Sequence, residues 1–239
     1  MRLALVSDQH GNDVAFGAVI ADLDRIGVDE AVCLGDAVQG GSQPAETLER
    51  LRALGWTTVL GNADAFLLEV PTDSPEPVTE QQLEVREWTL AQLGDSGLEQ
   101  IRAFEPVLYR ELDGVRLLFC HGSPASYDDV LLPDLGPDAL APFQGHEAAL
   151  IAGGHTHLQW SRRLDDGLYV NPGSVGISYD RHADEPLHLR TLAEWALVTV
   201  ENGEVAVEFR QVPYSRDDVR AAAARSGRPN ADEWAAQWA

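Results

Sequence analysis

The chain has 239 residues, of which 44% are hydrophobic, and its composition is typical of one large globular domain. Its net charge is −22 and all 17 basic residues are arginine, so nucleic acid and anionic lipid are disfavoured as partners. No apolar run approaches the ~20 residues that span a bilayer and the start is too acidic for a secretory signal, so we expect a cytoplasmic protein with reduced, buried Cys33 and Cys120.

Strand and helix patterns alternate in the first third of the chain. Strands are predicted at residues 2–7, 30–34 and 57–60, and helices at residues 14–26 and 45–54. This alternation is typical of a parallel sheet built from βαβ units, in which ligands bind at the carboxyl ends of the strands.

The middle of the chain changes character. Residues 70–80 are rich in proline, threonine and acids and predict a loop, and helices are expected at residues 81–93 and 98–104. We interpret residues 66–104 as a helical excursion from the sheet. Strands resume at residues 107–112 and 115–119, joined by the hairpin dipeptide Asp113-Gly114.

The rest of the chain is mainly β. A loop with one short helix is predicted at residues 127–147, because this segment is rich in proline and glycine. Strands follow at residues 149–152, 159–164, 168–171, 195–200 and 205–212, with hairpins at Asp165-Asp166-Gly167 and Asn202-Gly203. Residues 213–239 predict a tail of two short helices, divided at residues 227–229. Trp234 and Trp238 are four residues apart on one helical face, which we expect to pack on the core.

Polar motifs follow five of the predicted strands. In chain order they are Asp8-Gln9-His10, Gly35-Asp36, Gly61-Asn62-Ala63-Asp64, Cys120-His121-Gly122 and Gly153-Gly154-His155-Thr156-His157. Two residues at i and i+2 of an extended chain point the same way, so Asp8 and His10 can face one cation. A carboxylate such as Asp36 can bridge two cations with one oxygen to each, and the amide oxygen of Asn62 suits a hard ion. A turn or helix cap explains most of these motifs singly, but the ordered set predicts a metal site.

This ordered set resembles the calcineurin-like metallophosphoesterase superfamily, in particular its small bacterial and archaeal phosphodiesterases. The resemblance runs from Asp8 to a predicted buttressing turn, Asn171-Pro172-Gly173-Ser174, and extends in the core to about residue 212. It implies an α/β fold, a four-layer α/β/β/α sandwich of two mixed sheets with the metals at one edge. We therefore expect a metallophosphoesterase domain at residues 1–212 and a helical tail at residues 213–239.

The resemblance also implies which side chains bind two divalent cations. One cation would be held by Asp8, His10, Asp36 and His157. The other would be held by Asp36, Asn62, His121 and His155. A hydroxide that bridges the cations would then attack phosphorus in line with the leaving oxygen, and the predicted catalytic residues are Asp36, Asn62, Asp64 and His121. This mixed nitrogen and oxygen set favours Mn²⁺, with Fe, Zn²⁺ or Ni²⁺ as alternatives.

The sequence departs from the family pattern at Ala63. Many relatives have a histidine there that contacts the phosphate or protonates the leaving group, with the residue at Asp64 orienting it. A general acid contributes about 10²–10⁴ in rate and matters most for poor leaving groups, so its loss favours a phosphodiesterase. His146, Arg181 and His182 are candidate replacements, although a solvated surface position explains each of them better.

Two other functions stay open. A phosphomonoesterase or nucleotidase would use the same site, with substrate choice made by residues 66–104 and 127–147. A catalytically weak metal-binding scaffold, like one subunit of the eukaryotic retromer complex, agrees with the loss at Ala63, but the retention of all seven ligand positions speaks against it. We expect a small phosphate ester as the substrate, and a homo-oligomer is compatible with the sequence.

Overall fold

The structure is a computed structural model that describes residues 1–72, 77–134, 136, 141–165, 167–180 and 188–238. Two five-stranded sheets face each other. The first has the order β12 (Glu204–Pro213), β11 (Leu192–Glu201), β1 (Arg2–Val6), β2 (Glu30–Cys33) and β3 (Thr57–Thr58). The second has the order β4 (Leu108–Leu112), β5 (Val115–Phe119), β6 (Leu150–Ala152), β8 (Gly167–Pro172) and β7 (Gln159–Leu164). Both sheets are mixed, with β1, β2 and β3 parallel in one and β5, β6 and β8 parallel in the other.

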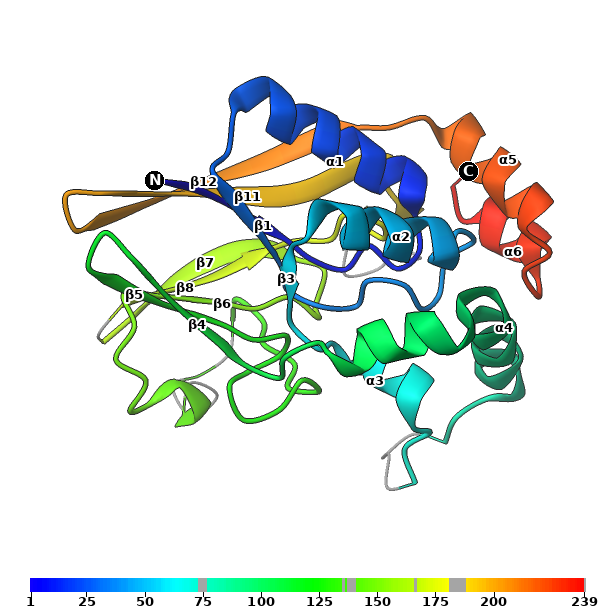
Figure 1. The fold of residues 1–239 in the computed structure, drawn as a ribbon, viewed down its shortest axis with the longest axis horizontal. Coiled ribbons are helices and arrows are strands. Elements are labelled where there is room, and N and C mark those ends of the chain that lie inside the picture. The colour runs from blue at the N-terminus through cyan, green and yellow to red at the C-terminus, as the bar shows by residue number, and fades with distance from the viewer. Residues whose placement is uncertain (73–76, 135, 137–140, 166, 181–187, 239) are drawn as a thin grey trace.

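Strand β1 is buried on both faces because the first sheet lies between helices and the second sheet. Leu3 and Leu5 point into the cluster between the sheets, where Leu117 and Phe119 also lie. Ala4 and Val6, on the opposite face, pack under the helices. These helices are α1 (Asp13–Ile26) and α2 (Pro44–Leu54), which cover the outer face of the first sheet (Figure 1).

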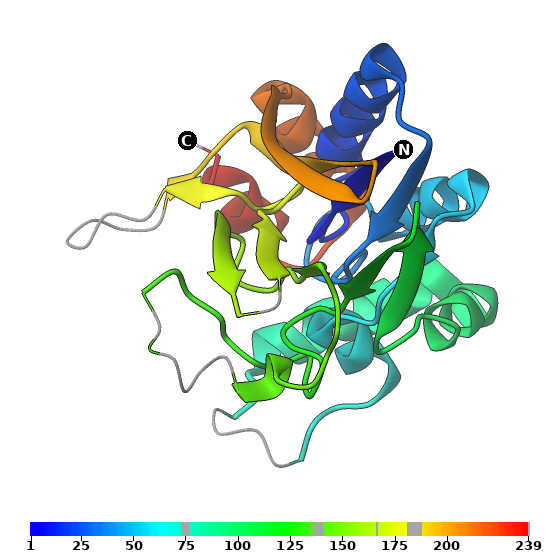
Figure 2. The ribbon, with the colours of Figure 1, turned by 90° about the vertical axis from the view of Figure 1, so that its left-hand side faces the viewer.

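The outer face of the second sheet is covered mainly by irregular chain. Ile151, Trp160 and Tyr169 of this sheet pack against Leu131 and Phe143 of the connection between β5 and β6. The described part of that connection contains one turn of 3₁₀ helix at residues 141–143. Figure 2 shows the two sheets and their coverings from the side. The predicted α/β class with two mixed sheets is confirmed, and the fourth layer is thin.

The helical excursion consists of α3 (Asn62–Leu68) and α4 (Glu80–Arg102). The two helices expected at residues 81–93 and 98–104 are both present within α4, and they are separated at Gly94, whose backbone is not helical (φ 61°, ψ −174°). Arg86 of α4 donates to the carbonyl oxygens of Phe66 at 2.7 Å and Leu67 at 2.9 Å, which fixes α4 to α3. The sequence did not predict that α3 begins at Asn62, within one of the polar motifs, and it did not predict the pairing of β9 (Tyr179–Asp180) with β10 (His188–Leu189).

The tail forms α5 (Arg216–Ser226) and α6 (Ala231–Ala236), divided at Gly227 as expected. Trp234 and Trp238 pack with Val219 of α5 against Val14 of α1. Both cysteines are free and buried. Among the described helices, none combines the length and apolar character needed to cross a bilayer.

Truncation of Leu117 tests the packing between the sheets. This side chain is fully buried in the cluster that both sheets share. We expect Leu117→Ala to lower the free energy of unfolding in urea by about 2–5 kcal/mol, through lost burial and the cavity left behind. Leu83→Ala is the control, because Leu83 lies on α4 with 36% of its surface exposed and should cost far less. Equal costs for the two variants would contradict the assigned core.

Candidate metal centre

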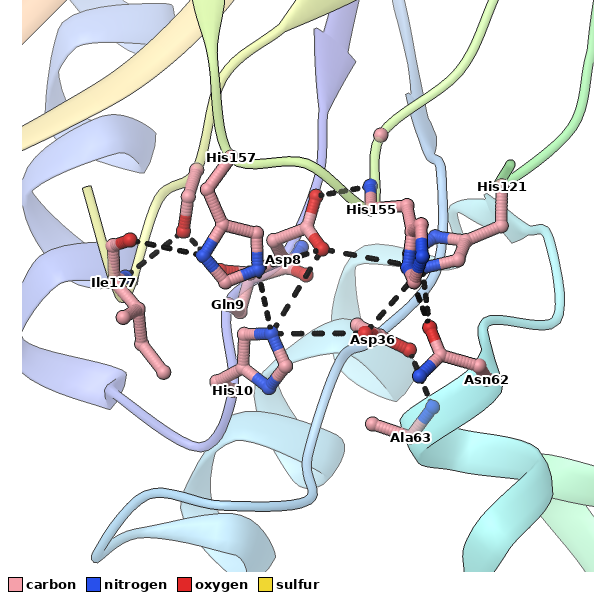
Figure 3. A network of polar contacts seen from close by, with 12 residues as sticks. Asp8, Gln9, His10, Asp36, Asn62, Ala63, His121, His155, His157 and Ile177 are labelled. Carbon is pink, nitrogen blue, oxygen red and sulfur yellow. Dashed lines mark hydrogen bonds and ion pairs between the residues drawn. The ribbon is translucent and has the colours of Figure 1, made fainter. Parts of the chain in front are cut away.

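The predicted ligands lie at one edge of the two sheets, where the parallel strands end. Asp8 and His10 follow β1, Asp36 follows β2, and Asn62 is the first residue of α3. The remaining ligands come from the second sheet, with His121 after β5 and both His155 and His157 after β6. All seven predicted metal ligands therefore lie at one place, as Figure 3 shows. Carboxyl ends of parallel strands meet in this way because the strands share a direction.

Six of the ligands form two clusters. Asp8, His10 and His157 make the first cluster, and Asp36, His121 and His155 make the second. Within each cluster the candidate ligand atoms lie within 4.8 Å of one another. Asn62 joins the second cluster, because its Oδ1 lies 3.0 Å from His121 Nε2 and 2.9 Å from His155 Nδ1. This grouping agrees with the ligand sets that the family resemblance implied.

Asp36 connects the two clusters through one oxygen atom. Its Oδ2 lies 3.6 Å from His10 Nε2 and 3.3 Å from His121 Nε2. Its Oδ1 accepts a hydrogen bond from the backbone N–H of Ala63 at 2.7 Å. In this geometry Oδ2 faces both clusters, and the expected bridge with one oxygen to each cation stays a prediction. Ala63 contributes its main chain, which orients the shared carboxylate.

Outer hydrogen bonds orient three of the four histidines. In each, Nδ1 lies against a backbone carbonyl oxygen: His10 against Gln39 at 2.8 Å, His121 against Leu34 at 2.7 Å and His157 against Ile177 at 3.0 Å. When Nδ1–H donates to the carbonyl, the lone pair of Nε2 points into the site, as a metal ligand requires. The sequence analysis missed these carbonyls, because a backbone acceptor has no residue signature.

The first cluster has the chemistry of a cation site. Asp8 is fully buried, and in the described structure its Oδ1 accepts no hydrogen bond of normal geometry. His157 Nε2 lies 3.2 Å from this oxygen and 3.0 Å from His10 Nε2. A buried carboxylate oxygen and two inward-facing ring nitrogens are costly without a positive charge between them. The residues present therefore fit a bound metal.

Charge and burial shift the pKa values of the second cluster strongly. Burial favours the neutral form of Asp36, but the imidazoles of His121 and His10 outweigh it and hold the pKa of Asp36 well below its usual range. Burial lowers the pKa of His121, but the carboxylate of Asp36 outweighs this effect and raises it to about 10. Asp36 and His121 thus stabilise each other as an ion pair.

Asp64 forms hydrogen bonds with the backbone of the residues that follow Asp36. Its Oδ1 accepts from the backbone N–H of Ala37 at 3.0 Å and of Val38 at 3.4 Å. Burial, together with the charge of Asp36, raises the pKa of Asp64 to about 7. Its predicted catalytic role stays a prediction, since these contacts are with the backbone of the loop.

The backbone at the ligands is unusual. The angle φ is positive at five of the seven: 57° at Asp8, 46° at His10, 53° at Asp36, 68° at His155 and 56° at His157. Non-glycine residues rarely adopt this left-handed conformation. The expectation that Asp8 and His10 lie in extended chain is therefore wrong. They converge because the chain turns sharply after β1 and bonds to the next loop, with His10 N–H donating to Asp36 O at 2.9 Å.

The turn at residues 171–174 supports the site from behind, as the sequence suggested. Asn171 Nδ2 donates to the carbonyl oxygen of Gly154 at 2.5 Å, and Ser174 Oγ donates to the carbonyl oxygen of Asp8 at 2.8 Å. Both bonds fix backbone that carries a metal ligand.

The proposed replacements for a histidine at Ala63 lie elsewhere or outside the described chain. His146 is outside both clusters, and its Nδ1 pairs with the hydroxyl of Tyr109 on β4 at 2.9 Å. Arg181 and His182 lie outside the described residues.

Gly154 tests how closely the two sheets must approach at the site. A Cβ there would lie 2.0 Å from Ser7 Oγ and 2.6 Å from Asp8 Oδ2. We expect Gly154→Ala to destabilise the protein by about 1–3 kcal/mol and to weaken divalent-cation binding, measured by calorimetry, by displacing Asp8. Gly17→Ala is the control, since nothing lies within 4 Å of a Cβ at that helical position. Unchanged cation affinity in Gly154→Ala would contradict this geometry.

Known proteins share this sequence pattern and fold. The family model of the calcineurin-like phosphoesterase superfamily domain matches residues 1–195. An uncharacterized protein of Methanocaldococcus jannaschii is 25% identical over 181 residues, which are 75% of this chain and 72% of that protein. A metallophosphoesterase from Sphaerobacter thermophilus superposes with a TM-score of 0.77 at 25% identity, covering 100% of this chain and 98% of that one. A hypothetical protein from Pyrococcus horikoshii OT3 shares the fold, with a TM-score of 0.79, 20% identity and coverage of 96% and 94%. The chain therefore belongs to the calcineurin-like phosphoesterase superfamily.

Proposed function

We propose that the chain is a phosphodiesterase that uses a pair of divalent cations. The observation that carries the proposal is the position of Asp36 Oδ2, 3.6 Å from His10 Nε2 and 3.3 Å from His121 Nε2. One carboxylate oxygen that faces both clusters suits two cations about 3.5–4 Å apart. When bound, such a pair neutralises phosphoryl charge and lowers the pKa of a water molecule.

The protein residues provide a site that is organised before the substrate arrives. His10, His121 and His157 are oriented by backbone carbonyls, and Asp36 by the N–H of Ala63. Groups that are fixed in advance stabilise developing charge without the cost of rearrangement. Imidazole, carboxylate and amide ligands together favour a transition metal, and we propose Mn²⁺, with Fe, Zn²⁺ and Ni²⁺ as alternatives.

The side chains of Ala63 and Asp64, which follow β3, favour a substrate that is a diester or another ester with a good leaving group. The methyl group of Ala63 cannot donate a proton, and the carboxylate of Asp64 faces the amides of Ala37 and Val38. Neither side chain is therefore arranged to protonate a leaving oxygen. An aliphatic monoester depends most on such a proton, because its alkoxide is a poor leaving group.

An apolar cleft next to the clusters supports the same choice. It has a volume of about 490 Å³, and His155 and His157 form part of its wall. Its apolar lining comes from Val130, Leu132, Ile177 and Tyr179. A diester carries a second organic group, and an apolar wall beside the reacting phosphorus suits such a group. Val130 and Leu132 belong to residues 127–147, which we expected to influence substrate choice.

Activity measurements on purified protein with quantified metal test the proposal. We expect about two equivalents of transition metal and faster hydrolysis of bis-p-nitrophenyl phosphate than of alkyl monophosphates. A clear preference for alkyl monophosphates would contradict the diesterase assignment and indicate a phosphomonoesterase. Bound metal without turnover of any phosphate ester would contradict an enzymatic function and indicate a metal-binding scaffold.

The shared carboxylate gives a sharper prediction. Asp36→Asn should lose both metal equivalents and nearly all activity, because the amide removes the charge that faces both clusters. His157→Ala should lose one equivalent, since His157 belongs to the first cluster. Asp24→Asn makes the same change of charge at an exposed site on α1 and should keep both. Retention of both metals by Asp36→Asn, measured by elemental analysis, would refute the bridging role.

The apolar cleft predicts an effect on substrate binding. Val130 is 57% exposed at the cleft, so its replacement should not disturb folding. We expect Val130→Ser to raise the KM for bis-p-nitrophenyl phosphate about fourfold, because each lost methylene-sized contact costs about 0.8 kcal/mol. Inhibition by inorganic phosphate, which has no organic group, should stay unchanged. Tyr127→Ser is the control, as Tyr127 is exposed on the same segment but does not line the cleft. Equal effects of the two variants would argue against this binding site.

A further inference from the structure

We infer that the C-terminal tail positions the metal ligands of the first cluster but not those of the second, with Arg228 as the main positioning residue. The inference rests on the proposed pair of metal ions. It concerns α5, α6 and the residues between them, which lie beyond the matched family domain that ends at residue 195. Figure 1 shows both helices together at one end of the molecule.

Arg228 connects the tail to the loop between β2 and α2. Its Nε donates to the carbonyl oxygen of Gly40 at 3.0 Å, and its Nη1 donates to the carbonyl oxygen of Pro229 at 2.7 Å. Its guanidinium lies over the ring of Trp234, 4.7 Å from the centroid. Burial lowers its pKa to about 10, so it remains charged at neutral pH. The described residues place no carboxylate in an ion pair with it, and the carbonyls and the ring are therefore its partners.

The loop that Arg228 contacts orients His10. The carbonyl oxygen of Gln39 lies 2.8 Å from His10 Nδ1, and Gly40 is the next residue. A Cβ on Gly40 would lie 3.6 Å from the same ring nitrogen, so the backbone of Gly40 passes directly beside the imidazole. Gly40 has a φ of 113° and is followed by Gly41. Gly41 packs closely against the backbone of His10, since a Cβ there would lie 2.0 Å from the carbonyl oxygen of His10, and the hydrogen bond from Arg228 restrains Gly40 from the other side.

The tail also packs behind His157. Trp234 and Trp238 form a cluster with Val219 that packs against the side chain of Ile177. The carbonyl oxygen of Ile177 lies 3.0 Å from His157 Nδ1. Two of the three ligands of the first cluster are therefore oriented by carbonyls in segments that the tail contacts.

The second cluster takes its support from the core. His121 Nδ1 lies against the carbonyl oxygen of Leu34, a fully buried residue that follows β2. Asp36 is held by the N–H of Ala63 in α3. In the described part of the chain, no hydrogen bond connects these supports to α5 or α6. Loosening the tail should therefore affect one metal ion and spare the other.

Binding of Mn²⁺ to the full-length Arg228→Ala variant tests the inference. Calorimetry and elemental analysis should show two Mn²⁺ ions in the original protein and, in the variant, one site weakened about tenfold, the lower end of the cost of losing a group that bonds directly to a ligand, because Arg228 acts through Gly40 beside such a group. Arg228→Lys should be intermediate, because its ammonium can still donate to Gly40. Arg220→Ala is the matched control, since Arg220 is exposed on α5 and the charge change is the same.

Double variants identify which site is weakened. His155→Ala leaves the first cluster intact, and His157→Ala leaves the second intact. Adding Arg228→Ala should weaken the remaining Mn²⁺ site of His155→Ala about tenfold and leave that of His157→Ala unchanged. With two equivalents of Mn²⁺ added, the paramagnetic resonance spectrum of the single variant should contain less coupled pair and more isolated ion than that of the original protein.

Other outcomes would overturn the inference. Equal weakening of both sites, weakening in the His157→Ala background, or unchanged binding in Arg228→Ala would each exclude selective positioning by the tail. If Arg228→Ala does not fold, Arg228→Lys decides the question by the same measurements. If the original protein binds no divalent cation, the proposed function fails as well, whereas two bound ions that are insensitive to Arg228 remove this inference alone.

Discussion

The structure depends on the burial of two carboxylates, Asp8 and Asp36, at the meeting edge of two sheets. Their side chains are almost completely shielded from water, and both face imidazole nitrogens. A carboxylate in such a place is costly unless positive charge compensates it. His121 Nε2 lies 3.3 Å from Asp36 Oδ2, and this carboxylate raises the pKa of the imidazole against the effect of burial. A pair of cations would supply the compensating charge more completely, and this requirement connects the fold to the proposed chemistry.

The fold meets this requirement at a cost in backbone conformation. Five of the seven ligands adopt a positive φ, which non-glycine residues avoid unless surrounding contacts enforce it. The enforcing contacts are visible: Ser174 holds the carbonyl of Asp8, Asn171 holds that of Gly154, and Asp64 holds the amide of Ala37. The residues with positive φ are therefore concentrated at the candidate metal site. The regular strands and helices next to them restrain their backbone.

The two clusters differ in how the chain supports them. The second cluster uses Leu34, which follows β2, and Asn62 and Ala63, which begin α3. The first cluster uses the carbonyls of Gln39 and Ile177, which lie in loops that the C-terminal helices contact. The second cluster is thus supported mainly from the core, and the supports of the first cluster lie in segments that the C-terminal tail contacts. This asymmetry is the basis for the proposed role of the tail, which contributes none of the candidate ligands.

The sequence by itself determined the α/β class and most strands, because apolar runs bounded by turn residues predict strands, and the ordered polar motifs after these runs carry the family resemblance that implies the seven candidate ligands. It did not reveal the start of α3, the left-handed turns, or the oxygen of Asp36 that faces both clusters. Tertiary structure alone decided these features and the carbonyl supports from Leu34, Gln39 and Ile177. The physical reason is that backbone groups are alike in every residue, so their roles arise only when folding brings distant segments into contact.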